Sequence, residues 1–448
     1  MPRNRTSRGR VHIVLIPGFA GFDALGQLEY YAGVTPQFQQ WKDSRQGRNS
    51  NDVALHYFDN FPTAAVRTRS ARLLRYLTTR MARGEFAEND SIALVGHSTG
   101  GLDIRWLLWE LNRTPSRSYP VDGATMSDRV LTAADILPRI KHLVFLSVPQ
   151  WGTNIADWVR SYKVMRQLVV TDLCVSFKGT QVPFLGSLEE SFWNCFSKTS
   201  KMGIVEAVRD VVSESETSCG DTATQVADAQ EAASETQLWL RHIATDFDAI
   251  DDLACENGAR DPQSPAHFDA ARRKEEIKGW KDLKTRSYAT VGARPFAFTP
   301  GEAAPVWDLC NPLTSPLCTP RPRPSPKSDV LYCTAYRACA GGPFQYPDGD
   351  APVAKPFFPK ASGPRTIELW DNDAIVNTAS MFWPNGKDTL LVECDHMDIV
   401  GHYEDVPSVS GGCKRKYQSY DLFKSGSNFT SEGFEQVWND VFGFCVSP

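Results

Sequence analysis

A short glycine-bounded stretch, Gly96 to Gly100 (Gly-His-Ser-Thr-Gly), has the residue types of a reactive serine in a tight turn. It follows the apolar run Ser91 to Val95 and precedes a segment with leucines at helical spacing. A serine between a buried strand and a helix needs small residues on either side, because strand and helix then approach closely. The pattern predicts that Ser98 is a nucleophile on a strand–turn–helix elbow.

A serine hydroxyl attacks a carbonyl efficiently only when a histidine takes its proton and a carboxylate orients that histidine. On an elbow of this type the acid and then the histidine follow the serine along the chain. His396 comes directly after the apolar run Thr389 to Cys394, where a loop can carry it over the sheet edge. His402 lies further along, and we interpret it as a loop or supporting residue. We therefore predict that His396 is the base.

Two aspartates compete for the role of the acid. Both follow an expected strand, Thr366 to Trp370. Asp371 comes directly after that strand, where it can instead cap a helix starting near Ala374. Asp373 lies in the turn beyond the strand end. We favour Asp373, and the family resemblance described below contributes to that choice.

Ester chemistry at a serine also needs two backbone N–H groups that bind the oxyanion of the tetrahedral intermediate. The residue after the nucleophile, Thr99, is expected to supply one of them. The other is expected from the turn Pro17 to Gly21, which follows the apolar run Val11 to Ile16. Phe19 is the expected donor there, since flanking glycines let the backbone come close to a substrate. A plain strand-ending turn is the alternative interpretation.

The elements that must position these residues alternate between short apolar runs and helical segments. Arg67 to Arg83 and Gly101 to Asn112 carry leucines at helical spacing. The apolar runs are mostly continuous, which is typical of strands buried on both faces of a parallel sheet. Further expected strands are Val53 to Tyr57, His142 to Ser147 and Ser287 to Val291. We predict a mostly parallel, doubly wound α/β sheet.

Two long segments interrupt this alternation. Residues 157–281 have a largely helical pattern and are expected to form an inserted cap. Its large apolar side chains between Val159 and Phe196 are expected in part to line an acyl pocket. Residues 299–364 are rich in proline and are expected to form an irregular surface excursion. The cysteines within it could stabilise this excursion. The catalytic core is therefore expected to comprise residues 1–156 and 282–448.

Composition narrows the class of protein. The 448 residues are 42% hydrophobic and carry a net charge of −5 spread along the chain, which does not favour nucleic acid as a partner. No apolar run is long enough to predict stable membrane insertion. Without a recognisable export signal, the 11 cysteines favour a cytoplasmic chain with reduced thiols. A mature secreted chain is the alternative, compatible with glycosylation sequons at Asn112 and Asn428.

Five blocks of the sequence together resemble bacterial-type lipases of the α/β-hydrolase superfamily, above all the branch related to Bacillus and Geobacillus lipases. The blocks are Pro17–Gly21, Gly96–Gly101, Ser147–Asp157, Asn372–Met381 and Asp395–Gly401. The resemblance implies an α/β-hydrolase fold. It also implies a triad of Ser98, Asp373 and His396, with Phe19 and Thr99 as the oxyanion donors.

The chain departs from those lipases in its metal sites. The histidines and aspartates that hold zinc in the family have no recognisable counterpart, so no zinc and no cofactor are expected. The family's calcium site uses acids just after the catalytic histidine. Asp398, Glu404 and Asp405 lie nearby, but their spacing differs, and we interpret them as a solvated acidic loop. The expected metal content is therefore none.

The leading hypothesis is hydrolysis of a carboxylic ester through an acyl-enzyme. The expected partner is a small apolar ester, thioester or lactone. The same triad would also serve an acyltransferase or an enzyme that closes or opens lactones, which is the alternative hypothesis. A non-catalytic binding protein is disfavoured, because competent residues fill all three triad positions.

Overall fold

The computed structural model covers residues 1–448. It describes residues 9–19, 21, 24–25, 28–44, 52–119, 130–161, 248–255, 263–295, 330–347, 349–358, 364–384, 386, 389–403, 421, 423 and 425–448.

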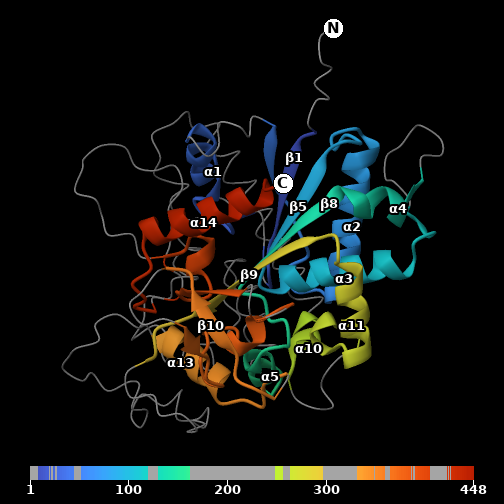
Figure 1. Cartoon of the computed structure of the whole chain (residues 1–448). Helices are drawn as coiled ribbons and strands as arrows, with labels where there is room; N and C mark the ends of the chain where they lie inside the picture. The colour runs from blue at the N-terminus through green and yellow to red at the C-terminus, as the bar shows by residue number, and fades with distance from the viewer. Residues whose placement is uncertain are drawn as a thin grey trace, which may run out of the picture.

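An eight-stranded sheet, in the order β11-β10-β12-β9-β8-β5-β1-β4, forms the centre of the fold (Figure 1). All neighbouring strands are parallel except β10 and β11, which pair antiparallel. In chain order the strands are β1 (Val11–Ile16), β4 (Val53–Tyr57), β5 (Ser91–His97), β8 (Ile140–Leu146), β9 (Lys284–Val291), β10 (Val353–Pro356), β11 (Arg365–Thr366) and β12 (Thr389–Glu393). The prediction of a mostly parallel sheet is confirmed.

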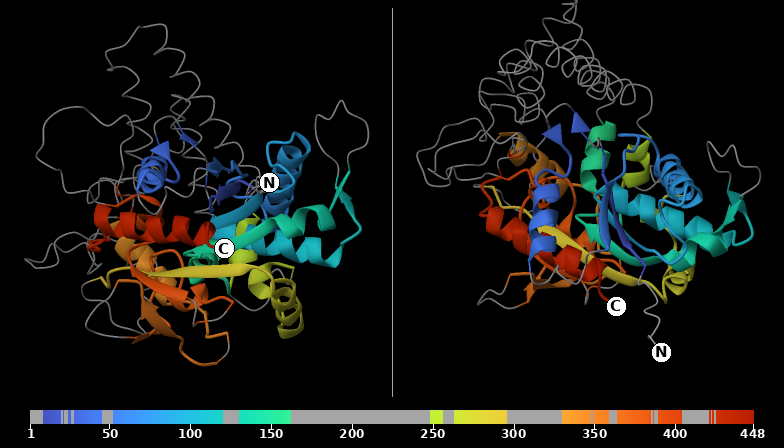
Figure 2. Two further views of the ribbon diagram at one scale, coloured as in Figure 1. Left: turned by 45° about the horizontal axis from the view of Figure 1, so that its top comes forward. Right: turned by 90° about the horizontal axis from the view of Figure 1, so that it is seen from above.

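Helices cover both faces of the sheet, so the strands are buried on two sides (Figures 1 and 2). On one face, Val14 and Ile16 of β1 pack with α2 (Val66–Ala82) and α3 (Thr99–Arg113). On the other face, Ile13 and Leu15 pack with α1 (Val34–Asp43) and α14 (Ser431–Cys445). This alternation explains why the strand reads as a continuous apolar run rather than one apolar residue in two.

Shorter elements connect these layers. The small strand pairs are β2 (Ala24–Leu25) with β3 (Leu28–Glu29), and β6 (Ser118–Tyr119) with β7 (Leu131–Thr132). The remaining helices are α4 (Ala133–Ile136), η1 (Leu137–Arg139), α5 (Asn154–Ser161), α10 (Ala249–Leu253), η3 (Pro265–His267), α11 (Ala270–Gly279), α13 (Val330–Ala340), η4 (Thr378–Met381) and η6 (Asp398–Val400).

The described ends of the expected cap, residues 157–161, 248–255 and 263–281, are helical or lie beside helices. The rest of the cap lies outside the described residues, and so does the expected acyl-pocket segment beyond residue 161. The cap as a unit stays a prediction. None of the described helices is both long and apolar enough to cross a membrane.

The segment before the two competing aspartates differs from the expectation. The predicted strand Thr366 to Trp370 is reduced to β11, which ends at Thr366. The chain turns away because Asp371 bonds back to Glu368: its N–H donates to the Glu368 carbonyl, and its carboxylate accepts the Glu368 N–H. The predicted helix near Ala374 is also absent, and that residue has a φ of 81° in a turn.

The proline-rich segment was expected to be irregular throughout, and this expectation is wrong for its second half. Helix α13 and strand β10 both lie within residues 299–364. Strand β10 pairs with β12 and thereby extends the central sheet. Strand β10 could not be predicted from the sequence, because a four-residue strand is too short for its apolar pattern to stand out among prolines.

Candidate active site

The elbow at Ser98 has the backbone geometry that a sharp strand-to-helix turn requires. Ser98 lies between the end of β5 and the start of α3, with φ 52° and ψ −132°. A positive φ is unusual for a residue with a β-carbon, and such strain persists only where the surroundings hold it. Here the Ser98 N–H donates to the Leu146 carbonyl at 2.9 Å, and the Gly101 N–H donates to the Ser98 carbonyl at 3.0 Å.

Glycine is required on both sides of this turn because backbone segments approach closely. A β-carbon placed on Gly96 would lie 2.7 Å from the Gly100 carbonyl carbon. One placed on Gly100 would lie 2.4 Å from the Ile16 carbonyl oxygen at the end of β1. The two glycines therefore let α3 pack directly against the strands that carry the site.

The turn after β1 contacts the elbow itself. A β-carbon on Gly18 would lie 2.5 Å from the Ser98 β-carbon and 3.0 Å from the His97 carbonyl oxygen. The next residue, Phe19, lies in a turn closed by a bond from the Gly21 N–H to the Gly18 carbonyl at 3.1 Å. The expected oxyanion loop is thus placed beside the expected nucleophile.

Thr99, the other expected oxyanion donor, is the first residue of α3. The first N–H groups of an α-helix have no acceptor within the helix, and they carry its positive end. Thr99 follows Ser98 directly, and Phe19 follows Gly18, whose backbone lies against Ser98. Their role as oxyanion donors stays a prediction.

Asp373 and His396 form a pair next to the elbow, where the His396 ring lies 4.6 Å from the ring of His97. The His396 Nδ1 is 2.8 Å from the Asp373 Oδ2, and both side chains are almost fully buried. A second bond joins their backbones, from the His396 N–H to the Asp373 carbonyl at 3.1 Å. Because an ionised carboxylate only accepts, Nδ1 carries the proton and Nε2 is left as the acceptor.

Three further donors fix the Asp373 carboxylate. Oδ1 accepts the N–H groups of Ile375 at 3.0 Å and Val376 at 2.7 Å. Oδ2 accepts the Thr290 hydroxyl at 2.6 Å as well as the histidine. The carboxylate is therefore held in one orientation towards His396.

Asp371, the competing acid, has other partners. Its Oδ1 lies 2.7 Å from Arg365 Nη2 and 4.0 Å from Arg294 Nη2, and its Oδ2 accepts the Glu368 N–H at 2.9 Å. These contacts make it a structural carboxylate of the turn rather than a cap of a helix. Of the two aspartates, the structure brings only Asp373 to His396.

Two other histidines lie close to the site. His97 is fully buried, and its ring lies 4.6 Å from the His396 ring, centre to centre. His402 is also fully buried, and its Nε2 lies 3.1 Å from the Tyr30 carbonyl oxygen. His402 is therefore placed as a supporting residue of the loop, in line with the interpretation of its sequence position.

Sequence reasoning missed Thr290 and Ser147, which stand behind the Asp373 carboxylate. Thr290 lies near the end of β9, and its hydroxyl oxygen is 2.9 Å from Ser147 Oγ. Ser147 follows β8 directly and has a φ of 50°. The sequence pattern places both residues in expected strands. Their position at the carboxyl ends of neighbouring parallel strands is the one signal that could indicate a place in the site.

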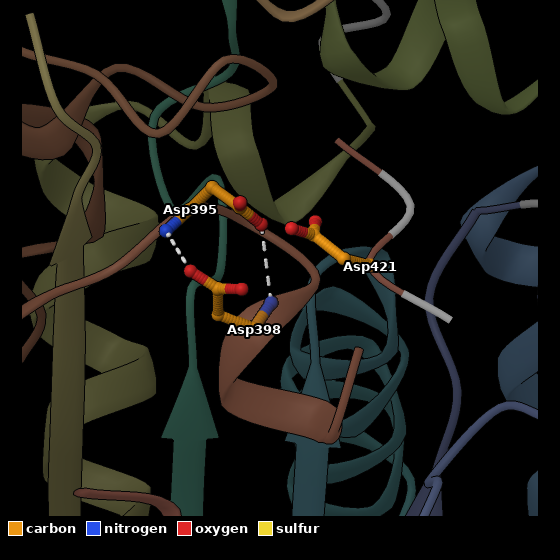
Figure 3. A group of neighbouring side chains, drawn as sticks. All are labelled: Asp395, Asp398 and Asp421. Carbon is orange, nitrogen blue, oxygen red and sulfur yellow. Dashed lines mark hydrogen bonds between the residues drawn. The ribbon is translucent and has the colours of Figure 1, made fainter. Parts of the chain in front are cut away.

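A group of three carboxylates includes Asp395, the residue before His396 (Figure 3). Oxygens of Asp395, Asp398 and Asp421 lie within 4.8 Å of one another. Asp395 and Asp398 also exchange backbone-to-carboxylate bonds, at 2.9 and 3.1 Å, as Figure 3 shows. The expectation that Asp398 belongs to a solvated loop is wrong, since it is the first residue of η6 and its buried carboxylate accepts the Ser427 hydroxyl. Glu404 and Asp405 lie outside the described residues.

The donor set fits a bound cation. Burial and the charge of Asp421 raise the pKa of Asp395 to about 7, and burial and Asp395 raise the pKa of Asp398. The Asp395 Oδ2 is buried without a hydrogen-bond partner among the described residues. Carboxylate oxygens are the ligands that Ca²⁺ prefers in proteins, and a cation would satisfy that oxygen and offset the repulsion.

The parallel sheet with helices on both faces, together with an elbow serine at the carboxyl end of β5 and an acid–histidine pair after later strands, defines an α/β-hydrolase fold. Solved bacterial structures are similar to it. EstA from Clostridium botulinum is 15% identical over 98% of this chain and 88% of its own, with a TM-score of 0.43. Lipase 1 from Pelosinus fermentans is 15% identical over 97% of this chain and 98% of its own, with a TM-score of 0.42.

The lipase of Staphylococcus hyicus is 11% identical over 99% of this chain and 96% of its own, with a TM-score of 0.42. No family model matches the chain, and no curated protein sequence matches it either.

Proposed function

We propose that this chain is a serine hydrolase that cleaves a carboxylic ester through an acyl-enzyme. The observation that carries the proposal is the hydrogen-bonded pair of Asp373 and His396 beside a strained elbow serine. A serine on a strained turn with no base nearby would have no means of losing its proton. Here an oriented histidine and a strained serine turn occur at the carboxyl edge of the sheet.

In the proposed mechanism, Nε2 of His396 takes the proton of the Ser98 hydroxyl as the serine attacks the ester carbonyl. Asp373 keeps the proton of His396 on Nδ1 and stabilises the imidazolium that forms. The N–H groups of Phe19 and Thr99 bind the oxyanion. His396 then protonates the leaving alcohol, and a water deprotonated by the same histidine releases the acid and regenerates Ser98.

The chemistry acts on a small apolar ester, thioester or lactone, and it requires no cofactor in these steps. Transfer of the acyl group to an alcohol would follow the same steps with a different second nucleophile. Product analysis with and without a competing alcohol separates the two reactions. A calcium ion held by Asp395, Asp398 and Asp421 would stiffen the loop that carries His396, without taking part in the reaction.

The test is covalent labelling by a fluorophosphonate together with turnover of nitrophenyl esters of increasing acyl length. We expect Ser98→Ala to lose both labelling and turnover while keeping its thermal unfolding temperature. The matched control is Ser70→Ala, a buried serine of α2 away from the site, which should keep both activities. Undiminished labelling of Ser98→Ala would refute the assignment of the nucleophile.

A further inference from the structure

A chain of hydrogen bonds crosses the site behind the elbow and joins the oxyanion loop to the base. The Gly18 N–H donates to the Tyr30 hydroxyl oxygen at 2.9 Å. The Tyr30 hydroxyl lies 2.6 Å from Nδ1 of His97, the residue immediately before the nucleophile. Nε2 of His97 in turn lies 3.0 Å from the carbonyl oxygen of His396.

Each group in this chain has only one possible role. The His396 carbonyl can only accept, so Nε2 of His97 carries the proton. Nδ1 of the neutral ring is then the acceptor, and the Tyr30 hydroxyl must donate to it. The Tyr30 oxygen remains available to accept from Gly18, whose N–H can only donate. The four groups therefore form one directed chain from the Gly18 amide to the His396 carbonyl.

Burial keeps both side chains in the protonation states that the chain requires. Burial, assisted by the nearby His396 and His402, holds the pKa of His97 well below its usual value. Burial likewise raises the pKa of Tyr30 above that of a free tyrosine. His97 therefore stays neutral, and Tyr30 keeps the hydrogen that it donates.

The chain connects parts of the site that are far apart in the sequence. Gly18 precedes Phe19, the proposed oxyanion donor, and a β-carbon on Gly18 would collide with Ser98. The His396 peptide carries the proposed base. A second bond joins Tyr30 to the loop that follows His396, since Nε2 of His402 lies 3.1 Å from the Tyr30 carbonyl oxygen.

We propose that Tyr30 and His97 are positioning residues that hold the oxyanion loop and the His396 peptide in register with the elbow. The proposal rests on the proposed function, because the loop and the base matter only if Ser98 attacks a substrate. Neither residue touches the reacting atoms. Their effect is therefore expected on the rate of the chemical step, with little effect on substrate binding.

The principal experiment compares Tyr30→Phe with Tyr31→Phe in the full chain. Tyr31 is the matched control, since it is also buried, and its hydroxyl donates to the Ile16 carbonyl at 2.6 Å and bonds to the backbone of His97 rather than to its ring. Both variants lose one buried hydroxyl and should lose similar stability. We expect Tyr30→Phe to lower kcat on a nitrophenyl ester by about 10- to 100-fold with KM within about twofold. Tyr31→Phe should keep kcat within about twofold.

A second pair of variants tests the other member of the chain and guards against a Tyr30 variant that fails to fold. His97→Gln keeps one donor and one acceptor at the end of its side chain, whereas His97→Leu removes both. We expect the glutamine variant to recover at least about tenfold in kcat over the leucine variant. Equal rates for the two would contradict a role through hydrogen bonding.

A spectroscopic measurement tests the hydrogen bonds through Tyr30 and His97 without an activity assay. In protein labelled with ¹⁵N-histidine, nuclear magnetic resonance should show His97 at neutral pH as the neutral tautomer with hydrogen on Nε2, while Tyr30→Phe shifts its Nδ1 resonance. A ring with hydrogen on Nδ1, or equal kcat for the Tyr30 and Tyr31 variants, would overturn the proposal. Failure of the proposed function is different: wild-type protein would then neither turn over esters nor be labelled at Ser98.

Discussion

The two halves of the site are built in different ways. The elbow half comprises the end of β1 with its turn and β5 with α3 (residues 11–19 and 91–113). The acid–base half comprises residues 364–403. In the elbow half, local backbone geometry fixes the chain: Ser98 has a positive φ, and Gly18 and Gly100 pack against the backbone or side chains of neighbouring strands. In the acid–base half, hydrogen bonds of side chains hold the irregular turns. The Asp373 carboxylate accepts hydrogen bonds from two backbone amides, a hydroxyl and a histidine.

The two halves should therefore tolerate different substitutions. A close backbone approach fails with a single added methyl group, whatever its polarity. A hydrogen-bonded turn keeps its path when the replacement residue keeps the bonds, and it fails when one donor or acceptor is lost. The elbow half should therefore respond to size and the acid–base half to hydrogen-bonding capacity.

The largest expected effect tests the acid–base half. Asp373→Asn should lower kcat by about 10⁴-fold, because an amide in place of the carboxylate favours the wrong tautomer of the histidine. The matched control is Asp371→Asn, two residues earlier, whose partners are arginines and a backbone amide. It should lower kcat by less than about tenfold. Steady-state kinetics on one nitrophenyl ester measures both, and the reverse ranking would show that Asp371 is the acid.

The elbow half was predictable from sequence because its requirements are local. The strands Val11–Ile16 and Val53–Tyr57 have the expected bounds, and the strand leading to Ser98 extends only two residues beyond its predicted end. Helix α3 begins two residues before its expected start, with Thr99 as its first residue. A continuous apolar run, glycines at fixed offsets and a helical leucine pattern suffice to specify such a unit.

The acid–base half was only partly predictable because distant residues determine it. The pattern of residues 366–370 resembles a strand, yet the bonds between Asp371 and Glu368 end it after Thr366. Nothing in the sequence marks Thr290 as the donor to Asp373, or Tyr30 as the partner of His97. The burial of Asp398 was missed for the same reason, since polar side chains beside a turn suggest exposure.

The second largest effect concerns a buried ion pair that bonds to the turn after β1 in the elbow half. Arg69 of α2 and Asp103 of α3 form a fully buried pair at 2.9 Å, and the guanidinium also donates to the Pro17 carbonyl at 2.7 Å. Asp103→Ala should reduce the free energy of unfolding by about 3–5 kcal/mol, because it leaves a buried charge unpaired. The exposed pair of Arg72 and Asp59 is the control, and Asp59→Ala should cost less than about 1 kcal/mol. Denaturant unfolding measures both, and equal losses would contradict the assignment.

The third effect tests the size rule of the elbow half. Gly18→Ala places a β-carbon where only 2.5 Å separates it from Ser98, so the turn must shift away from the nucleophile. We expect kcat/KM to fall by about 10²- to 10³-fold, the usual cost of losing one oxyanion donor. In the control Gly443→Ala, the new β-carbon has no neighbour within 4 Å, and helix α14 should gain up to about 1 kcal/mol. A Gly18→Ala enzyme with wild-type kinetics would show that the close contact does not constrain the loop.

The smallest effect separates the two halves by their dependence on a cation. Asp395 and Asp398 of the acid–base half form a cluster of carboxylates with Asp421, and the Asp395 oxygen without a hydrogen-bond partner among the described residues gives a cation its clearest ligand. Ca²⁺ at about 100 times its dissociation constant should add about 2.7 kcal/mol, equivalent to about 3 °C in unfolding temperature for a chain of this length.

Asp395→Asn should abolish this shift. It should also raise the unfolding temperature of the calcium-free protein at pH 8, where removing one charge relieves repulsion from Asp398 and Asp421. Differential scanning calorimetry of the chelated protein, with and without added Ca²⁺, measures both shifts in unfolding temperature. Mg²⁺ is the control ion, because it demands near-octahedral ligands. A calcium shift of the same size in Asp395→Asn would place the ion elsewhere in the chain.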